Sequence, residues 1–581
     1  MFRNALVTSS RRQSRLCYGV AHAMQDASSR TPYLIPRRSA AVVVTTTAVF
    51  LWYLSSDLVH NDAVHTLPSN SGSALSKRTS STGVDESGAL CAVVWGSNKS
   101  NLIGPQSPGI ETFQTPVNAK WLENVALRDL ALHEKHAACV DARGDVCQWG
   151  DGFSCSKSDV KAPKITLRGK NIVKVQLTGS RVYALSATGR IYVFAANEEQ
   201  QQLPKPRISS ATSWDLSGWT GRERQAIDFV EIFPKERLNW GEKLISIAAG
   251  SDHLLALTSE GRTYAHPINK DANSHGQLGL RRVEIPAPSN LKDAAGRIAI
   301  ELVPRSVASP SLRESSPTVA SEHLNVMDDR HIGFSDLLGV KVSQIAAGDR
   351  SSFVNTSSGK VLGWGANEHG QIGLGSRITL DTIIIPTEID LARNIPVSTK
   401  SKCLSIYAGG DLTCFVAERN AQESHTYVDT LCCGNGQWGG LGNNTFSTFQ
   451  GNPVRVRNVS GLHEFDEQKQ KLSPIIPHAI SGVTHRSYFT VSRHSVACWP
   501  GASGRDLVAW GLNHDYQLGT GKRTSLNAAT ILERPEGDRF ILGRRKATVR
   551  DLSGKVWKNN VEVEQCAIAG HGNSVVYWKL R

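Results

Sequence analysis

The stretch VLGWGANEHGQIGLGS, residues 361–376, returns in altered form as LVAWGLNHDYQLGTGK at residues 507–522. Each copy opens with apolar, strand-forming residues, reaches a Trp-Gly pair, and continues through Asn, Gly and Gln, which favour turns. A close copy at such a distance indicates that one structural unit recurs along the chain. This repeat, more than any single motif, decides the fold.

The full unit consists of a strand that ends at a glycine, a second strand that ends at a turn, and a third strand that ends at Trp-Gly. In KVSQIAAGDRSSFVNTSSGKVLGWG, Gly359 lies eleven residues after Gly348, and Trp364 lies five residues after Gly359. The same offsets run from Gly250 through Gly261 to His266, and from His133 through Gly144 to Trp149. Looser copies run from Gly179 to Phe194, from Gly409 to Cys433-Gly434, and from Gly482 to Trp510-Gly511.

The two ends of the repeat region hold complementary half units. CAIAGHGNSVVYWKLR opens a unit at Gly570, and the sequence stops at Arg581, whereas LCAVVWGSNKSNLIG closes a unit at Trp95-Gly96. Six full units and two halves make seven. The sequence therefore predicts an all-β fold, a seven-bladed β-propeller over residues 89–581 whose N- and C-terminal strands close one blade and leave no exposed seam.

Each position that recurs from unit to unit is expected to have a structural role. Tryptophans are expected to fill the gaps between neighbouring blades, and glycines are expected at positive-φ turns or close backbone approaches. Asn and Gln side chains in the loops are expected to satisfy buried backbone groups. The signature residues are Trp95, Gly96, Trp149, Gly150, Gly250, Gly348, Trp364, Gly365, Gly434, Trp510, Gly511 and Gly570.

The N-terminal residues are predicted to be a targeting signal. Residues 1–38 hold seven arginines, no lysine and one acid, Asp26, a net charge of +6 out of +13 for the chain. This is the pattern of a mitochondrial transit segment, the alternative being a disordered basic tail. The remaining +7 is poor support for a nucleic-acid partner, which would require a basic stripe.

Residues 39–56, SAAVVVTTTAVFLWYLSS, are eighteen uncharged residues that as a helix would reach about 27 Å and just span a bilayer. We expect a single transmembrane helix, the alternatives being a cleaved sorting signal or a buried apolar segment. Arg37 and Arg38 before it favour the propeller in the intermembrane space, although the matrix stays open. Residues 57–88 are polar and Ser-rich and are expected to be a flexible linker.

The repeat resembles the regulator of chromosome condensation repeat family. The resemblance rests on AAGDRS at 346–351 followed by WGANEHGQIGLG, on AAGSDH at 248–253 with SHGQLG at 274–279, and on WGLNHDYQLGTG at 510–521. It implies a seven-bladed propeller. The chain is also similar to fungal mitochondrial inner-membrane members of the family, and this similarity implies a role in assembly of a respiratory-chain complex, complex III in particular.

No motif indicates catalysis, a cofactor, a metal or a small-molecule substrate. Residues 434–439 match GxGxxG but no helix is expected after them, and GTGKR at 519–523 lacks the other residues of a phosphate loop. His136, His253 and His485 occupy one repeat position, where each is expected to cap a local backbone group rather than bind metal. The eleven cysteines have no zinc or disulfide spacing and are expected to be free and buried.

We therefore expect a non-enzymatic protein-interaction scaffold of the mitochondrial inner membrane, with inner-membrane complex subunits or assembly factors as partners. The alternative is guanine nucleotide exchange on a small GTPase, the activity of the founding family member. Insertions at 198–240, 281–338 and 443–478 either carry a function specific to this protein or are neutral variation in loop length. The Ser/Pro-rich part near 300–330 is expected to be disordered.

Overall fold

A computed structural model describes residues 89–581, apart from 108, 155–161, 202–226, 235–236, 270, 280–281, 287–296, 302–325, 328–340, 394, 422–425, 467–469, 484–485, 488–489, 492–493, 502–503 and 535–536. The predicted transit segment, membrane helix and linker lie outside these residues. Within the described part, no helix has the length and apolar character needed to cross a membrane.

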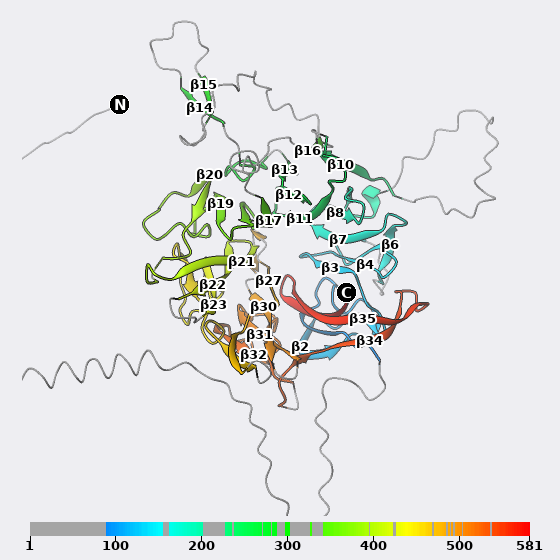
Figure 1. Ribbon diagram of the computed structural model, residues 1–581. Coiled ribbons are helices and arrows are strands. Elements are labelled where there is room, and N and C mark those ends of the chain that lie inside the picture. The colour runs from blue at the N-terminus through cyan, green and yellow to red at the C-terminus, as the bar shows by residue number, and fades with distance from the viewer. Residues whose placement is uncertain are drawn as a thin grey trace, which may run out of the picture. The chain divides into compact units, whose positions relative to one another are not determined.

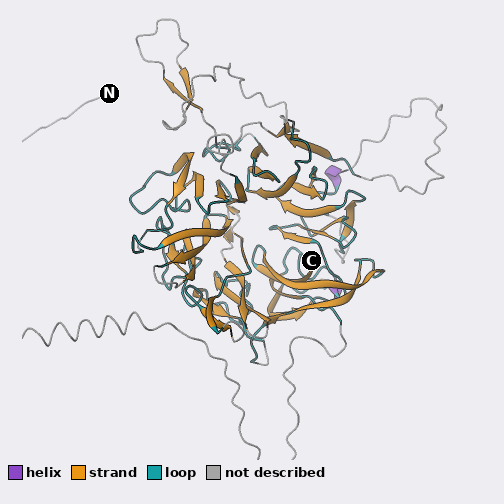
Figure 2. Ribbon diagram, in the orientation of Figure 1, coloured by secondary structure: helices purple, strands orange, loops and turns teal. Residues whose placement is uncertain are grey.

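Seven β-sheets are arranged around a central axis, as the repeat predicts (Figure 1). Strands and loops make up almost all of the described chain, and the helical elements in it are two short 3-10 turns, η1 (Lys120–Leu122) and η2 (Glu199–Gln201) (Figure 2). Each sheet is a blade, and we number the blades along the chain from the first complete one. In blades 1 to 6 the strand nearest the axis comes first and its neighbours follow outward, whereas in blade 7 β35 (Val556–Ala569) lines the axis and β34 (Arg544–Arg550) precedes it in the chain.

The strands are assigned to blades as follows. Blade 1 contains β3 (Asp129–Leu132), β4 (Ala137–Val140), β5 (Val146–Trp149) and β6 (Lys164–Leu167). Blade 2 contains β7 (Ile172–Leu177), β8 (Arg181–Ser186), β9 (Ile191–Ala195) and β10 (Val230–Pro234), with β16 (Val326–Met327) added in parallel. Blade 3 contains β11 (Leu244–Ala249), β12 (His253–Thr258) and β13 (Thr263–Pro267). Blade 4 contains β17 (Val342–Ala347), β18 (Ser351–Thr356), β19 (Val361–Ala366) and β20 (Thr382–Ile389).

Blade 5 contains β21 (Lys400–Gly409), β22 (Leu412–Asn420), β23 (Thr426–Gly434) and β24 (Val454–Arg455). Blade 6 contains β27 (Ala479–Val483), β30 (His494–Gly501), β31 (Gly504–Gly511) and β32 (Leu526–Ile531), with β33 (Ile541–Leu542) also on β31. Blade 7 contains β34 (Arg544–Arg550), β35 (Val556–Ala569), β36 (Asn573–Leu580), β1 (Val93–Ser97) and β2 (Thr112–Asn118). Three hairpins lie outside the blades: β14 (Arg282–Pro286) with β15 (Arg297–Glu301), β25 (His463–Asp466) with β26 (Lys471–Pro474), and β28 (Arg486–Ser487) with β29 (Thr490–Val491).

The two ends of the propeller share one sheet. β1 pairs antiparallel with β36, with Val93 opposite Val576 and Gly96 opposite Asn573. The Ser97 N–H also donates to the Gly572 carbonyl at 2.8 Å. The half units at the chain ends thus complete blade 7, and the ring has no unpaired seam between its first and last strands.

The apolar core lies between blades rather than inside one of them. One buried cluster joins Val140 and Val146 of blade 1 to Val182 and Phe194 of blade 2. Other clusters join blade 3 to blade 4 and blade 5 to blade 6 in the same way. Because each sheet buries both faces against neighbours, its strands are nearly continuous apolar runs.

One cysteine expectation is wrong. Cys414 on β22 and Cys432 on β23 form a disulfide, whereas the sequence was expected to hold only free thiols. The two residues face each other directly in the strand register, with Cα atoms 4.2 Å apart, and this pairing puts both sulfurs on the same side of the sheet. Cys139 and Cys147 also face each other, on β4 and β5, but remain free and buried.

Removing this disulfide is expected to destabilise the propeller. The bond closes a loop with a sequence separation of 18, so its loss should lower the free energy of unfolding by about 3 kcal/mol through greater freedom of the unfolded chain. Urea unfolding of the wild type and of Cys414→Ala/Cys432→Ala, each with and without reductant, measures the effect. Equal midpoints for all four samples would show that the bond contributes nothing.

The insertions are ordered to different degrees in the described residues. The insertion at 443–478 forms β24 and the β25–β26 hairpin, and the insertion at 281–338 contributes β14, β15 and β16. The segment near 300–330 that the sequence predicts to be disordered lies outside the described residues, apart from the end of β15 and the two residues of β16.

Candidate functional site

The signature tryptophans lie between neighbouring blades. The indole Nε1 of Trp364 on β19 donates to the Gln277 carbonyl of blade 3 at 2.9 Å. Equivalent bonds run from Trp95 to Gln517, from Trp149 to Leu102, and from Trp510 to Gly440, at 2.8 to 3.0 Å. All four side chains are less than 2% exposed, so each fills an inter-blade gap and also satisfies a backbone carbonyl there.

The loop that follows each signature strand is fixed by its own amide side chains. Gln371 Oε1 accepts the His369 backbone N–H at 2.9 Å, and Asn367 Oδ1 accepts the Ile372 N–H at 3.2 Å. Gln277 and Gln517 make the same contact with the residue two positions before them. Because these bonds satisfy buried backbone donors, the loops form a rigid surface on one face of the propeller.

The signature glycines occupy places where a side chain does not fit. The glycines of the Trp-Gly pairs, and Gly434 after Cys433, have positive φ. A Cβ on Gly365 would stand 2.4 Å from a backbone oxygen of a neighbouring turn, and one on Gly434 would stand 2.0 Å from such an oxygen. Gly250 and Gly348 have no positive φ, but a Cβ on either would lie about 2.5 Å from the carbonyl of the next blade. These glycines therefore permit the close approach of adjacent blades.

In the blades that lack the signature tryptophan, another buried side chain fills the same gap between blades. Cys433, in the tryptophan place of blade 5, is fully buried and its Sγ donates to the Gln371 carbonyl at 3.3 Å. Burial raises the pKa of the Cys433 thiol, so it stays protonated as a donor. Phe194 and His266 hold the same place in blades 2 and 3 and are also buried.

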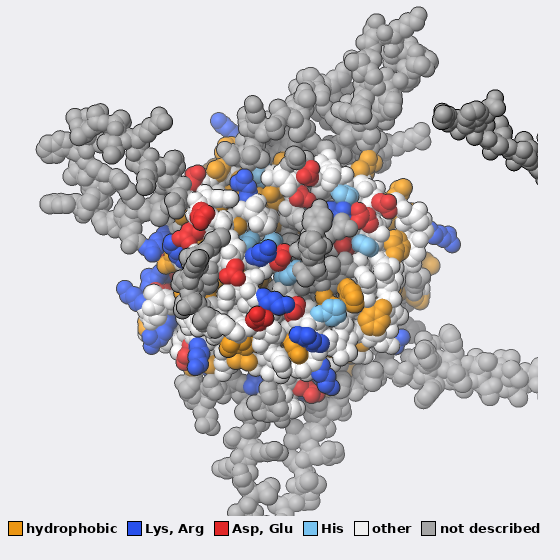
Figure 3. All heavy atoms as spheres, turned by 180° about the vertical axis from the view of Figure 1, so that it is seen from behind, with side chains coloured by type: hydrophobic (Ala, Val, Ile, Leu, Met, Phe, Trp, Pro, Cys, Tyr) orange, Lys and Arg blue, Asp and Glu red, His pale blue; other side chains and the backbone are white. Residues whose placement is uncertain are grey.

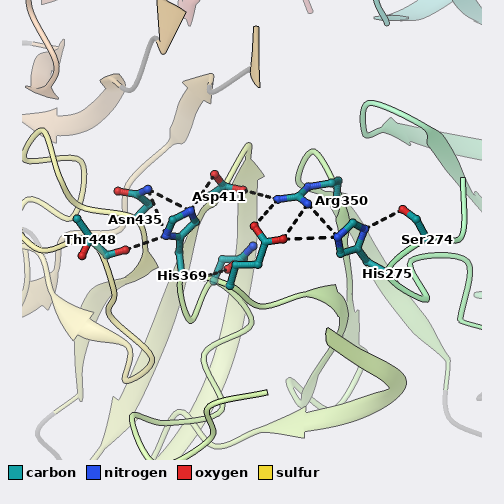
Figure 4. A network of polar contacts seen from close by, with 9 residues as sticks. Ser274, His275, Arg350, His369, Asp411, Asn435 and Thr448 are labelled. Atoms are coloured by element: carbon teal, nitrogen blue, oxygen red, sulfur yellow. Dashed lines mark hydrogen bonds and ion pairs between the residues drawn. The ribbon is translucent and has the colours of Figure 1, made fainter. Parts of the chain in front are cut away.

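A polar network connects the loops of blades 3, 4 and 5 (Figure 4). At its centre Arg350, from the turn between β17 and β18, donates to both carboxylate oxygens of Glu368 at 3.0 and 2.8 Å. Asp411 of blade 5 lies 4.0 Å from the same guanidinium. Burial opposes the charge on Arg350, but the hydrogen bonds and charges of Glu368 and Asp411 raise its pKa above the ordinary value.

Two histidines extend this network to its outer members. A guanidinium can only donate hydrogen bonds, so Arg350 donates to His275 Nε2 at 2.9 Å. The proton of the neutral His275 ring therefore lies on Nδ1, which faces the Ser274 hydroxyl. His369 Nδ1 donates to the Thr448 carbonyl at 2.9 Å, and its Nε2 lies 3.6 Å from an Asp411 oxygen. The bonds cross two blade interfaces and fix the relative positions of three blades (Figure 4).

A cavity of about 410 Å³ runs along the axis, lined by the inner strands of all seven blades. Its wall is mostly Ala, Gly, Leu and Ile, with Asp129 and Lys174 among its few charged residues. Burial raises the pKa of Asp129 and lowers the pKa of Lys174. In the described residues, no group of three or more His, Cys, Asp or Glu side chains is arranged to hold a metal ion.

The role expected of the histidines at one repeat position needs correction. His253 Nε2 bonds to the Ser352 hydroxyl of the next blade at 2.8 Å, not to a local backbone group. His136 stacks on His133 with ring centroids 4.8 Å apart. His485 lies outside the described residues. His253 therefore contributes to a contact between blades, whereas His136 packs on a histidine of its own blade.

The burial of His253 predicts a pH effect. Desolvation lowers its pKa to about 4 from 6.5, so the folded state holds the ring neutral and stability is complete above about pH 6.5. Stability should fall by about 2 kcal/mol between pH 7 and pH 5 from this residue alone. Urea unfolding of His253→Gln at both pH values should show a correspondingly smaller decrease, and an equal decrease would contradict this assignment.

The glycine-rich run at 434–439 continues into turns rather than a helix, so it has no phosphate-binding helix terminus. Figure 3 shows one face of the molecule, where basic, acidic, histidine and apolar side chains are interspersed without a dominant charge.

The repeat of the regulator of chromosome condensation (RCC1) family matches residues 342–371 and 358–416. These residues belong to blades 4 and 5, so this part of the chain carries repeats of the regulator of chromosome condensation type. The similarity of the chain to the mitochondrial protein FMP25 of Saccharomyces cerevisiae is 24% identity over 476 residues, which is 80% of this chain and 70% of that protein.

Two further proteins are similar to this chain. The mitochondrial RCC1 domain-containing protein RUG3 of Arabidopsis thaliana is 28% identical over 55% of this chain and 60% of its own length. The crystal structure of Prp20p from Saccharomyces cerevisiae, described with its binding to Gsp1p and histones, matches with a TM-score of 0.50 and 17% identity, covering 85% of this chain and 92% of Prp20p. This last match supports the fold alone.

Sequence reasoning missed the network around Arg350. His275 and His369 both stand in the diagnostic N-x-H-G-Q pattern, two residues before the buried glutamine, and this repeated position is the signal that could have found them. Their partners come from turns of neighbouring blades, which the sequence does not align. The sequence therefore lacks the information on which loop residues of neighbouring blades face each other.

Proposed function

We propose that this protein is a non-enzymatic interaction scaffold of mitochondria. The observation that carries the proposal is the similarity to mitochondrial FMP25 along 80% of the chain, well beyond the residues that match the repeat itself. RUG3 supports the same compartment. The rigid polar loops of blades 3 to 5 supply a face on which a protein partner can dock without reordering the chain.

We further propose that the chain is tethered to the inner membrane by residues 39–56, with the propeller in the intermembrane space, and that it aids assembly of a respiratory-chain complex, complex III in particular. The support is the apolar segment after an arginine-rich leader. The Cys414–Cys432 disulfide favours a compartment that permits thiol oxidation.

Proximity labelling tests the submitochondrial location and the partner proteins together. An enzyme fused to the C-terminus should label intermembrane-space and inner-membrane proteins in intact mitochondria, including subunits or assembly factors of complex III. After removal of the outer membrane, added protease should degrade the propeller. Labelling of matrix or nuclear proteins instead would contradict the proposed location.

Nucleotide exchange on a small GTPase is the second candidate, since the fold of Prp20p is shared. We identify no described residue that would act on the nucleotide site of a GTPase. The purified full-length chain should leave the rate of nucleotide release from mitochondrial and cytosolic small GTPases unchanged, and accelerated release would favour exchange over the scaffold role.

A further inference from the structure

One hairpin of blade 7 carries an excess of basic residues. The β34–β35 hairpin, whose paired residues run from Arg544 to Glu564, contains six Arg or Lys residues and three acids, a net charge of +3. All six basic residues lie within 544–558, and two of the three acids, Glu562 and Glu564, lie after them on β35. The turn end of the hairpin is therefore its basic part.

The hairpin presents its basic residues to solvent. Along β34, Arg544, Lys546 and Arg550 are exposed, whereas Ala547 and Val549 between them pack into an apolar cluster of blade 7. β34 is the last strand of its sheet and pairs only with β35 through most of its length. The basic side chains therefore lie on the outward surface of an edge strand.

Most of these charges have no counter-ion within the described residues. Arg544 pairs with Glu562, but Lys546, Lys555 and Lys558 make no ion pair there, and Arg550 donates only to the Gly554 carbonyl. Asp551, the acid nearest the turn, is held by Arg143 of blade 1 at 3.0 Å. Lys546 lies opposite Glu562 in the strand register, so the basic residues farthest from the hairpin's glutamates are those around the turn, Arg550, Lys555 and Lys558.

The hairpin also lies where the chain enters the propeller. The Arg545 guanidinium donates to the carbonyl of Ala89, the first described residue, and stacks on Trp578 at 4.9 Å. The Trp578 indole in turn donates to the Cys91 carbonyl at 3.0 Å. The first described residue of the chain, Ala89, therefore lies beside this hairpin.

Apolar side chains interrupt the charges near the turn of the hairpin. Val556 is 44% exposed and Trp557 is half-buried, and lysines 555 and 558 flank them. A strand edge that mixes Lys with exposed apolar and aromatic groups suits the boundary between lipid headgroups and acyl chains. Nucleic acid would favour a longer basic track with several aromatic faces, and an acidic protein would not require the apolar residues.

We propose that the β34–β35 hairpin binds anionic lipid headgroups of the membrane to which the chain is tethered. The inference rests on the proposed membrane tether, which supplies the surface and holds it close. Each basic residue near an anionic surface strengthens binding about fivefold, so reversing three charges removes at least about a 100-fold preference for anionic over neutral lipid. The contact orients the propeller relative to the bilayer.

The test uses the full-length chain reconstituted into vesicles of phosphatidylcholine, with or without about one fifth anionic cardiolipin, and follows amide hydrogen exchange of residues 544–560. Exchange should slow at least about fivefold in anionic vesicles and recover in 0.5 M salt, as screening predicts. Lys546→Glu/Lys555→Glu/Lys558→Glu should abolish this protection. The matched control Lys341→Glu/Lys400→Glu/Lys471→Glu reverses three exposed charges elsewhere and should keep it.

Equal exchange in anionic and neutral vesicles would overturn the proposal, as would protection that the control variant loses equally. Protection by RNA or by polyglutamate, with none from anionic vesicles, would also overturn it in favour of another partner. Alkaline carbonate extraction of the same vesicles tests the tether separately. Release of the chain by carbonate would refute the anchor, while the difference between anionic and neutral vesicles would still decide the hairpin.

Discussion

Replacing Gly365 by alanine is expected to lower the free energy of unfolding by at least about 3 kcal/mol. Gly365 has φ of +104°, and a Cβ there would lie 2.4 Å from the Arg350 oxygen and 2.8 Å from the Ser351 Cα. Backbone strain costs about 1 to 3 kcal/mol, and the overlap with fixed backbone atoms adds a similar amount. Relief would require blade 4 to separate its signature strand from the turn that carries Arg350.

The matched control is Gly169→Ala. Gly169 also has positive φ, at +70°, but an added Cβ there meets nothing within 4 Å. It should cost about 1 kcal/mol, from backbone strain alone. Urea unfolding followed by circular dichroism compares the two variants, and equal losses would show that the close approach at Gly365 is unimportant.

Trp364→Ala is expected to cost about 4 kcal/mol, the second large effect. The indole is fully buried within the cluster between blades 3 and 4, and its removal leaves a cavity that rigid neighbours cannot fill. Trp364→Phe keeps most of the buried area but loses the N–H that binds the Gln277 carbonyl. It should cost about 1 to 2 kcal/mol less than the loss of the whole ring.

Trp240→Ala provides the control, because Trp240 is fully exposed at the surface. Its effect should stay within about 0.5 kcal/mol. The same urea unfolding measurement applies to all three variants. A small effect of Trp364→Ala would mean that the inter-blade tryptophans do not hold the ring together.

The repeat made the ring predictable. Gly348, Gly359 and Trp364 recur at constant offsets, and the half units at Trp95 and Gly570 required the two ends to meet. This inference needed only the order of strands within one unit. The fold class follows from the repeat because each blade can bury its faces only against its neighbours.

Contacts between strands or blades were harder to predict. Cys414 and Cys432 lie at equal distances from the connection between β22 and β23, so counting from that connection could have paired them. The contact of Arg350 with His275 depends on the angle between blades, which no spacing encodes. The basic end of the β34–β35 hairpin becomes visible only once the two strands are known to pair, because its charges come from both strands and the turn.

The central claim is that both chain ends form one blade, and an engineered disulfide tests it most directly. Val94 on β1 and Val575 on β36 face each other one residue before the signature position, the same register that Cys414 and Cys432 occupy in blade 5. In Val94→Cys/Val575→Cys, oxidation followed by mass spectrometry of unreduced peptides should find residues 94 and 575 linked within one molecule. Finding both as free thiols, or linked only between molecules, while the Cys414–Cys432 link is present, would contradict closure.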